Sequence, residues 1–317
     1  MRNILITGGF GLLGKSMVNY LLKKKFRVIV LDYKTNRKKN LFEKKVKNLV
    51  VIKGNFIDKK IVNKIFNRYK FSGIFHFGAQ TQVLNAHKKP YNTYQVNVLG
   101  TLNFLEKLRE LKSKVPFIYS SSDKAYGELE KKNYLETDKL NAIFPYDTSK
   151  STSDLISQSY SKTYNIKVGI VRSANIFGPY DFNMKRIVPE TIVSALKGKK
   201  LIIRSNGKLR RDYIFVEDVC RAYYLIYLNL LKNKNNLLVY NIGSKYNLTT
   251  IQIVKEIFKI LKIKENYIVK NSTKGEIKNQ RLNYNKIKKD LKWKPNTSLN
   301  FGLSETIKWY KNNINLF

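Results

Sequence analysis

The sequence has few cysteines, few histidines and no long apolar run, and each shortage excludes a class of protein. Cys220 is the only cysteine among 317 residues, so no internal disulfide can form and a cysteine-rich zinc cluster is excluded. His76 lies inside an apolar run and His87 lies far off in a loop, so they suggest no metal site, and we interpret His76 as a core residue. No apolar run reaches the roughly 18 residues that a membrane span needs, and nothing resembles a signal peptide. We therefore expect a soluble, cytoplasmic protein without a membrane partner.

Acidic residues are also scarce. The chain has 22 Asp and Glu against 61 Lys and Arg, which gives a formal net charge of +39. Such an excess could indicate nucleic-acid binding. The lysines are scattered, however, and short clusters such as residues 23–25 and 37–39 do not form one basic stripe. We interpret the charge as compositional and expect no nucleic-acid partner, although the positive field would attract anionic substrates.

A glycine-rich turn near the N-terminus predicts a dinucleotide site. The strand at residues 4–6 runs into glycines at positions 8, 11 and 14 and then into an amphipathic helix, which aims a helix N-terminus at a pyrophosphate. The next strand ends in Asp32, where such folds place the acid that grips the adenosine ribose. Asp32 would repel a 2′-phosphate and favours NAD, while Lys34 and Arg37 leave NADP open. The predicted cofactor-binding residues are Gly8, Phe10, Gly11, Leu12, Gly14, Asp32, Asn55 and Ile57.

Strands alternate with helices along the first half of the chain. Further apolar runs at residues 49–52, 74–77, 115–119 and 168–171 predict strands, and the spacing over 93–111 predicts a helix. This alternation predicts an α/β fold with a doubly wound, parallel Rossmann-type sheet. Asn55, after the third strand, could contact an adenine edge or could simply form a polar turn.

The second half of the chain predicts a smaller lobe interleaved with the first. No repeat or low-complexity linker separates tandem domains, and the Gly178-Pro179 turn is a plausible boundary. We expect an NAD-binding domain at 1–176, joined by about 213–242. The substrate lobe then comprises 177–212 and 243–317.

A chemically varied stretch follows the strand at residues 115–119. Three serines at 120–122, then Asp123 and Lys124, stand where open α/β sheets place ligands, outside the carboxyl ends of the strands. Tyr146 and Lys150 are four residues apart and share one helix face. A free phenol has a pKa of about 10 and is a poor base at neutral pH; Lys150 would stabilise the phenolate and lower the pKa of Tyr146. Ser122, Asp123, Lys124, Tyr146 and Lys150 are therefore the candidate catalytic residues.

Together these motifs resemble the extended short-chain dehydrogenase/reductase family, specifically its NAD-dependent sugar-nucleotide epimerases and dehydratases. The resemblance covers essentially the whole chain. It comprises segments 7–11, 76–80, 97–101, 120–122, 146–150, 175–179 and 211–219. Asp123-Lys124 after the serine, with segments 145–150 and 181–189, is similar to the CDP-glucose 4,6-dehydratase-like branch. Asn55 and Asn283 depart from the family, which usually carries acids at these two positions.

The resemblance implies a reaction, a substrate class and a homodimer. Tyr146 takes the C4 hydroxyl proton as hydride leaves C4 for NAD, Lys124 removes the C5 proton, and Asp123 protonates the leaving C6 hydroxyl. Hydride then returns to C6, which yields a 4-keto-6-deoxy nucleotide sugar. Asn175 and Arg211 would hold the nucleotide diphosphate, with Arg281 as a weaker candidate.

Two other interpretations stay open. A 4-epimerase would need Ser122, Tyr146 and Lys150 but not the Asp123-Lys124 pair. A non-catalytic nucleic-acid-binding relative would account for the charge of +39 but has no physical need for the catalytic trio. In isolation, Asp123 and Lys124 could also be an exposed ion pair that contributes little.

Overall fold

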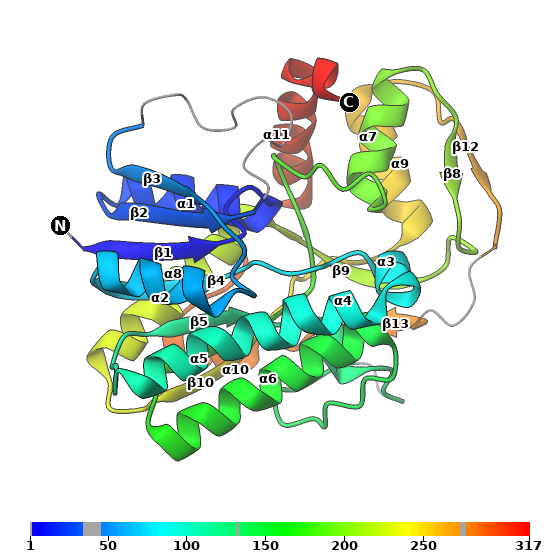
Figure 1. Cartoon of the computed structure of the whole chain (residues 1–317). Helices are drawn as coiled ribbons and strands as arrows, with labels where there is room; N and C mark the ends of the chain where they lie inside the picture. The colour runs from blue at the N-terminus through cyan, green and yellow to red at the C-terminus, as the bar shows by residue number, and fades with distance from the viewer. Residues whose placement is uncertain (1, 34–45, 131–132, 273–276) are drawn as a thin grey trace.

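A seven-stranded parallel sheet forms the centre of the molecule (Figure 1). The computed structural model describes residues 2–33, 46–130, 133–272 and 277–317, so Lys34 and Arg37 lie outside the described residues. The strands lie in the order β10-β6-β5-β4-β1-β2-β3, and every neighbouring pair is parallel. They are β1 (Asn3–Thr7), β2 (Arg27–Asp32), β3 (Leu49–Lys53), β4 (Phe71–His76), β5 (Phe117–Ser120), β6 (Val168–Ser173) and β10 (Leu237–Ile242). The predicted doubly wound Rossmann-type sheet is confirmed.

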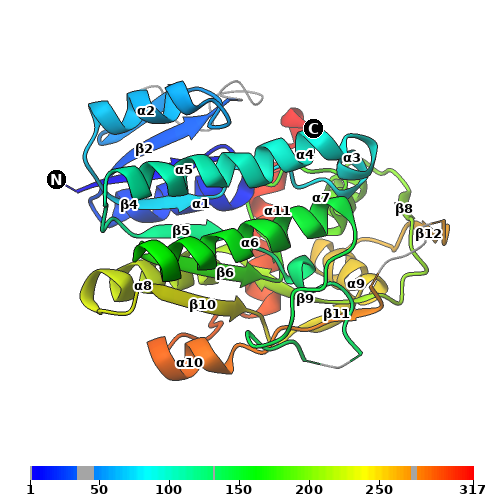
Figure 2. The ribbon, with the colours of Figure 1, turned by 60° about the horizontal axis from the view of Figure 1, so that its bottom comes forward.

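Each face of this sheet packs on its own hydrophobic core, because alternate side chains of a strand point to opposite faces. Ile4 and Ile6 of β1 pack with α1 (Leu12–Lys23) and α8 (Val216–Lys232). Leu5, between them, joins the other core, with α2 (Lys59–Arg68) and α5 (Gly100–Glu110). Figure 2 shows α6 (Pro145–Tyr164) beside α5 on that second face.

The helix predicted over residues 93–111 is divided in the structure. α4 (Pro90–Tyr94) continues through the π-helical turn η1 (Gln95–Leu99) into α5. Inside this turn, Asn97 accepts a hydrogen bond from Gln80 N (2.8 Å) and donates to Ser149 Oγ (2.8 Å). Such turns frequently occur at functional sites, and here the turn fixes the segment that follows β4.

Most of the remaining elements gather beyond the carboxyl ends of the large sheet (Figure 1). β9 pairs with β7, β11 and β13, and β8 pairs with β12. These strands are β7 (Asn175–Phe177), β8 (Leu201–Ile203), β9 (Arg210–Phe215), β11 (Asn247–Thr249), β12 (Tyr267–Val269) and β13 (Asn279–Gln280). The helices are α3 (Val83–Lys88), η2 (Asp123–Tyr126), α7 (Ile187–Leu196), α9 (Thr250–Leu261), α10 (Asn285–Leu291), α11 (Leu299–Asn312) and η3 (Ile314–Leu316).

The position of β10 agrees with an interleaved chain path. The chain leaves the large sheet after β6, forms α7 to β9, and returns through α8 to β10 as an edge strand. α10, from the predicted substrate lobe, packs against β10 and α8. We keep the two-lobe division as a proposal.

Candidate active site

One cleft of about 350 Å³ opens where the strands of the large sheet end. Its walls come from the turns after β1, β2, β3, β4, β5 and β6 and from the start of α6. Of the predicted cofactor residues, those lining the cleft are Gly8, Gly11, Leu12, Gly14, Asp32, Asn55 and Ile57. Of the predicted catalytic residues, Ser122, Tyr146 and Lys150 line it. The parallel strands therefore bring predicted cofactor-binding residues and predicted catalytic residues into one cavity.

The glycine turn is shaped so that a ligand can approach the protein backbone closely. Gly8 has φ +69°, and a Cβ there would lie 2.8 Å from Gly78 Cα. A Cβ on Gly14 would lie 2.1 Å from Gly8 O, so a side chain would displace the helix from the turn. A Cβ on Gly11 would meet only Gly8 O, at 3.5 Å, and would otherwise project into the open cleft. This is the arrangement that a pyrophosphate at the N-terminus of α1 requires.

Asp32 and Asn55 lie at the far end of the same cleft. Asp32 is buried at the end of β2 and accepts a hydrogen bond from Phe10 N at 3.2 Å. Phe10 itself is buried beside the cleft, so it orients the acid through its backbone. Asn55 Oδ1 accepts from Ile57 N at 3.1 Å, and both residues also line the cleft. Asn55 therefore forms a polar turn and remains within reach of a ligand. A dinucleotide fits this set of residues.

Side chains of α6 form hydrogen bonds with the serines at the end of β5. Lys150 Nζ donates to Ser120 O at 2.7 Å, and Ser121 Oγ donates to Asp154 Oδ2 at 2.7 Å. Asp154 is fully buried and paired with Arg172 at 2.9 Å. Ser121 thus ties the turn after β5 to α6, and it also lines the cleft.

Tyr146 and Lys150 have opposite pKa shifts with the same main cause. Burial raises the pKa of Tyr146 to about 12, although Arg186 and a hydrogen bond with Ser122 act to lower it. Burial also lowers the pKa of Lys150 to about 8. The sequence predicted that Lys150 lowers the pKa of the phenol, and this stays a prediction. In the structure, burial has the largest effect on the pKa of Tyr146, and the charge that lowers it most is Arg186.

Asp123 and Lys124 are not an exposed surface pair. Asp123 is only 6% exposed, and its Oδ1 accepts from Ser122 Oγ at 3.0 Å. Burial raises the pKa of Asp123, against the opposing effects of Lys124 and Arg211. Neither residue lines the cleft directly, and Ser122 connects Asp123 to it.

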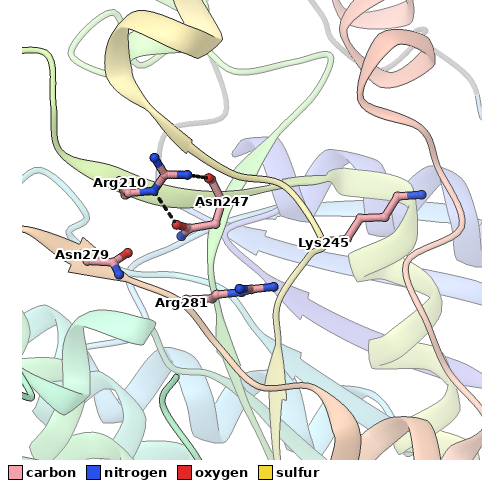
Figure 3. Close-up of a pocket in the computed structure, with 5 residues that line it drawn as sticks. All are labelled: Arg210, Lys245, Asn247, Asn279 and Arg281. Atoms are coloured by element: carbon pink, nitrogen blue, oxygen red, sulfur yellow. Dashed lines mark hydrogen bonds between the residues drawn. The ribbon is translucent and has the colours of Figure 1, made fainter. Parts of the chain in front are cut away.

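A second pocket, of about 380 Å³, contains the positive charge expected for a diphosphate site. It is lined by Arg210, Lys245, Asn247, Asn279 and Arg281 (Figure 3). Arg210 donates to Asn247 O at 2.6 Å, while Lys245 extends away from the other four side chains (Figure 3). Gln280, between Asn279 and Arg281, donates to Asp123 O at 3.3 Å and so links this pocket to the turn η2 after β5.

The residues that the sequence predicted for phosphate binding lie in different places, and their role stays a prediction. Arg211 is buried and donates to Arg210 O at 2.8 Å, and Arg210 lines the second pocket. Asn175 lies on β7 opposite Tyr213 and lines neither pocket. Arg281 lies where the sequence placed it.

Sequence reasoning missed two further residues beside Tyr146. Arg186 lines the cleft and pairs with Asp181 at 3.1 Å. Asp147 is 4% exposed, its Oδ1 has no hydrogen-bond partner among the described residues, and burial raises its pKa to about 6. An arginine in a loop and an acid after Tyr146 carry no distinguishing pattern of their own, so only proximity identifies them.

His76 is confirmed as a core residue. It is buried, its Nδ1 is hydrogen-bonded to Thr7 Oγ1 at 2.9 Å, and burial lowers its pKa to about 3. Within the described ranges, no group of three His, Cys, Asp or Glu could hold a metal ion. No helix in this part of the chain is long and apolar enough to cross a membrane.

Comparison with known proteins agrees with this geometry. Residues 5–306 match the family described as GDP-mannose 4,6 dehydratase. A dTDP-D-glucose 4,6-dehydratase from Dictyostelium discoideum is 31% identical, covering 99% of this chain and 83% of the relative. A dTDP-glucose 4,6-dehydratase from Haemophilus influenzae is 29% identical, covering 98% of each chain.

Solved structures show the same similarity. A dTDP-glucose 4,6-dehydratase from Bacillus anthracis in complex with NAD is 28% identical, with a TM-score of 0.87 and coverage of 100% of this chain and 99% of the other. A UDP-glucose 4-epimerase from Thermotoga maritima with UDP-glucose is 30% identical, with a TM-score of 0.87 and coverage of 99% and 100%. The chain therefore belongs to the GDP-mannose 4,6 dehydratase family, within the NAD-dependent epimerase/dehydratase group that its motifs predicted.

Proposed function

We propose that the protein is an NAD-dependent nucleotide-sugar 4,6-dehydratase. One observation carries this proposal: a buried carboxyl, Asp123, is hydrogen-bonded to Ser122 at the wall of the cleft that also contains Tyr146. Elimination of water from C6 requires an acid next to the group that deprotonates the C4 hydroxyl. A 4-epimerase has no use for such an acid. The relatives named as 4,6-dehydratases support the same reaction class.

The residues of the chain divide the reaction between them. Tyr146 accepts the proton of the C4 hydroxyl, and the resulting ketone makes the C5 proton acidic. Lys124 removes that proton while Asp123 protonates the departing C6 hydroxyl, which the raised pKa of Asp123 favours. When bound in the glycine cleft, NAD would supply the hydride acceptor for C4 and the hydride donor for C6. The hydrogen bond from Lys150 to Ser120 O would hold the start of α6 against the end of β5 at the wall of the cleft.

The basic pocket supports a diphosphate-linked substrate. Arg210, Lys245 and Arg281 are all exposed to solvent, and none of the described residues that line this pocket is acidic. Arginine suits bidentate phosphate binding, and Gln280 connects the pocket to Asp123. We assign the nucleotide diphosphate to this pocket and the hexose to the space beside Ser122. The pocket constrains the nucleobase of the substrate less. The dehydratases named above act on dTDP-glucose, and CDP-glucose-like specificity stays a prediction.

We also propose a homodimer formed through α5 and α6, which pack together on one face of the large sheet. Leu99, Leu111 and Leu155 are about half exposed along these helices, and a second copy of the chain would cover them. Cytoplasmic localisation stays a prediction.

Incubation with NAD and a panel of nucleotide hexoses, followed by mass spectrometry, tests the proposed reaction. We expect one substrate to lose one water while NAD is not consumed. A product of unchanged mass would instead establish an epimerase. As a matched test, Asp123→Asn combined with Lys124→Met should lower dehydration by about 100-fold or more. The same double variant would leave epimerase turnover largely intact.

A further inference from the structure

Residues 180–183 form part of the cleft wall, and the backbone there is strained. Tyr180, Asp181, Phe182 and Asn183 line the same cleft as the glycine turn. Tyr180 has φ +71°, a left-handed conformation that glycine adopts readily and an aromatic residue adopts only at an energetic cost. Such a conformation persists only where the surrounding structure holds it, and such positions cluster at ligand sites. Two helices, α1 and α11, hold this one.

The Tyr180 side chain reaches α1, the helix that follows the glycine turn. Its hydroxyl accepts a hydrogen bond from Asn19 Nδ2 at 3.4 Å, and Lys15 Nζ lies 5.6 Å from the centre of its ring. Lys15 directly follows Gly14, which lines the cleft. A ligand bound at the N-terminus of α1 therefore has residues 180–183 as its neighbours.

The last turn of α11 contacts three successive residues of the same segment. Trp309 packs edge-on against Tyr180 and Phe182, with ring centres 5.2 Å and 5.6 Å apart, respectively. Tyr310 donates a hydrogen bond to Asp181 O. Trp309 therefore touches both aromatic side chains of the segment, and its removal would free both of them at once.

The Asp181 carboxylate makes the segment a single unit. Its Oδ1 accepts a hydrogen bond from Asn183 N at 3.0 Å, and its Oδ2 accepts one from Arg186 at 3.1 Å. Arg186 lines the cleft as well. A displacement of residues 180–183 would therefore move this part of the cleft wall as one piece.

α11 is a firm support because other residues of the helix are packed into the core. Leu303, Thr306 and Ile307 are buried, and a Cβ on Gly302 would lie 3.1 Å from the ring of Phe215. Figure 1 shows α11 beside α7, the helix that follows the segment along the chain. Contacts outside the cleft therefore fix the position of α11.

We propose that Trp309 is a positioning residue for the cofactor: it clamps residues 180–183 against α1 and so retains NAD in the cleft between the two hydride transfers. Trp309 does not line the cleft itself, so it acts through the segment. The inference rests on NAD binding in this cleft and goes beyond the proposed dehydration, because a 4-epimerase would need the same retention. In either reaction the hydride taken from the sugar returns to it from the same bound NADH. Early release of NADH would leave an oxidised sugar and a protein without its cofactor.

The rate of NADH release measures the clamp directly and needs no sugar substrate. Full-length wild type and variants are loaded with NADH and mixed with excess NAD, and the loss of protein-bound NADH fluorescence gives the rate. Trp309→Ala removes the clamp, whereas Trp309→Phe keeps an aromatic ring. Phe301→Ala, on the exposed side of the same helix, is the control. Urea denaturation gives the free energy of unfolding of each variant.

Tyr180→Gly separates retention of the cofactor from stability of the fold. Glycine adopts φ +71° without strain, so this variant relieves the backbone while it loses the ring that links α1 to α11. If the ring served the fold alone, Tyr180→Gly should release NADH at the wild-type rate. If the clamp retains the cofactor, this variant should release NADH faster even though its backbone is relaxed.

We expect NADH release to be about tenfold faster in Trp309→Ala and in Tyr180→Gly, since aromatic contacts contribute on this scale. Trp309→Phe should stay within about threefold of the wild type, and Phe301→Ala should match it. Wild-type release rates in Tyr180→Gly would overturn the clamp, whether or not Trp309→Ala releases NADH faster through a loss of stability. A wild type that retains NADH but converts no nucleotide hexose would refute the proposed function and leave the clamp standing. A wild type that binds no NADH would refute the clamp.

Discussion

Charged groups behave in opposite ways in two regions of the molecule. One is the wall of the cleft around Tyr146 and Lys150, which we call the catalytic wall, and the other is the basic pocket around Arg210 and Arg281. Burial has the largest effect on the pKa values of Tyr146 and Lys150, and it favours the neutral form of each side chain. In the basic pocket, Arg210 and Arg281 are exposed and keep their charge in solvent. Proton transfer needs groups that can change charge at low cost, whereas anchoring a diphosphate needs cations that never do. The comparison predicts that substitutions on the wall change kcat, and that substitutions in the pocket change KM.

Tyr146→Phe should have the largest effect and would test the first half of the comparison. Removing the hydroxyl leaves the ring in place but removes the acceptor for the O4 proton and the hydrogen bond with Ser122. We expect kcat to fall by about 1,000-fold with little change in KM, since general acid–base groups contribute on this scale. Steady-state kinetics with the identified substrate measures both constants. Tyr164→Phe, at the exposed end of the same helix, is the control. A rise in KM at constant kcat would mean that Tyr146 only binds the sugar.

Arg281→Ala and Arg210→Ala should have smaller effects that appear in the other constant. Each removes one exposed cation from the basic pocket, so we expect KM to rise about tenfold, or ~1.4 kcal/mol, with kcat nearly unchanged. Because salt screens exposed charges, the KM of the wild type should rise with ionic strength more steeply than the KM of either variant. Lys199→Ala, an exposed lysine in the turn after α7, is the control for total charge. A fall in kcat as large as that of Tyr146→Phe would contradict the division between wall and pocket.

The two regions also differ in how far the sequence could predict them. The glycine turn and Asp32 depend only on neighbouring residues and one strand, so their spacing alone predicts that they lie together, and they line one cleft. The Tyr146-x-x-x-Lys150 spacing is likewise local, because helix geometry puts both residues on one face. What the sequence could not show is that burial has the largest effect on the phenol pKa, and that the cation which lowers this pKa most is Arg186.

The basic pocket depends on pairings between distant strands. Arg210 and Arg211 are adjacent on β9, where side chains alternate between faces, so a one-residue difference decides which one reaches the pocket. β9 is flanked by β11 and β13, with Arg211 opposite Leu248 and Gln280. No local pattern reveals this register. The sequence predicted a role for Arg211, which stays a prediction, and gave no sign that Arg210 lines the pocket.

The smallest expected effect is on the free energy of unfolding. It tests whether the burial of Lys150 has a measurable effect apart from catalysis. The folded-state pKa of Lys150 is about 8, against a reference value of 10.5. Between these values the unfolded chain binds a proton that the folded protein has released, so the free energy of unfolding gains a contribution that rises with pH. Below pH 8 both states are charged and the buried ammonium destabilises the fold. Lys150→Met lacks this contribution, so its stability advantage over the wild type should be greatest below pH 8 and shrink toward pH 10.

Urea denaturation of the cofactor-free proteins at a series of pH values measures this difference. Tyrosines with raised pKa values, Tyr146 among them, lower stability as the pH rises above 10, but they do so in both proteins and cancel in the comparison. Lys162→Met, on the exposed side of the same helix, should follow the wild type at every pH. If Lys150→Met also runs parallel to the wild type, solvent reaches the Lys150 ammonium. The catalytic wall would then be as wet as the basic pocket, and the distinction between the two regions would rest on geometry alone.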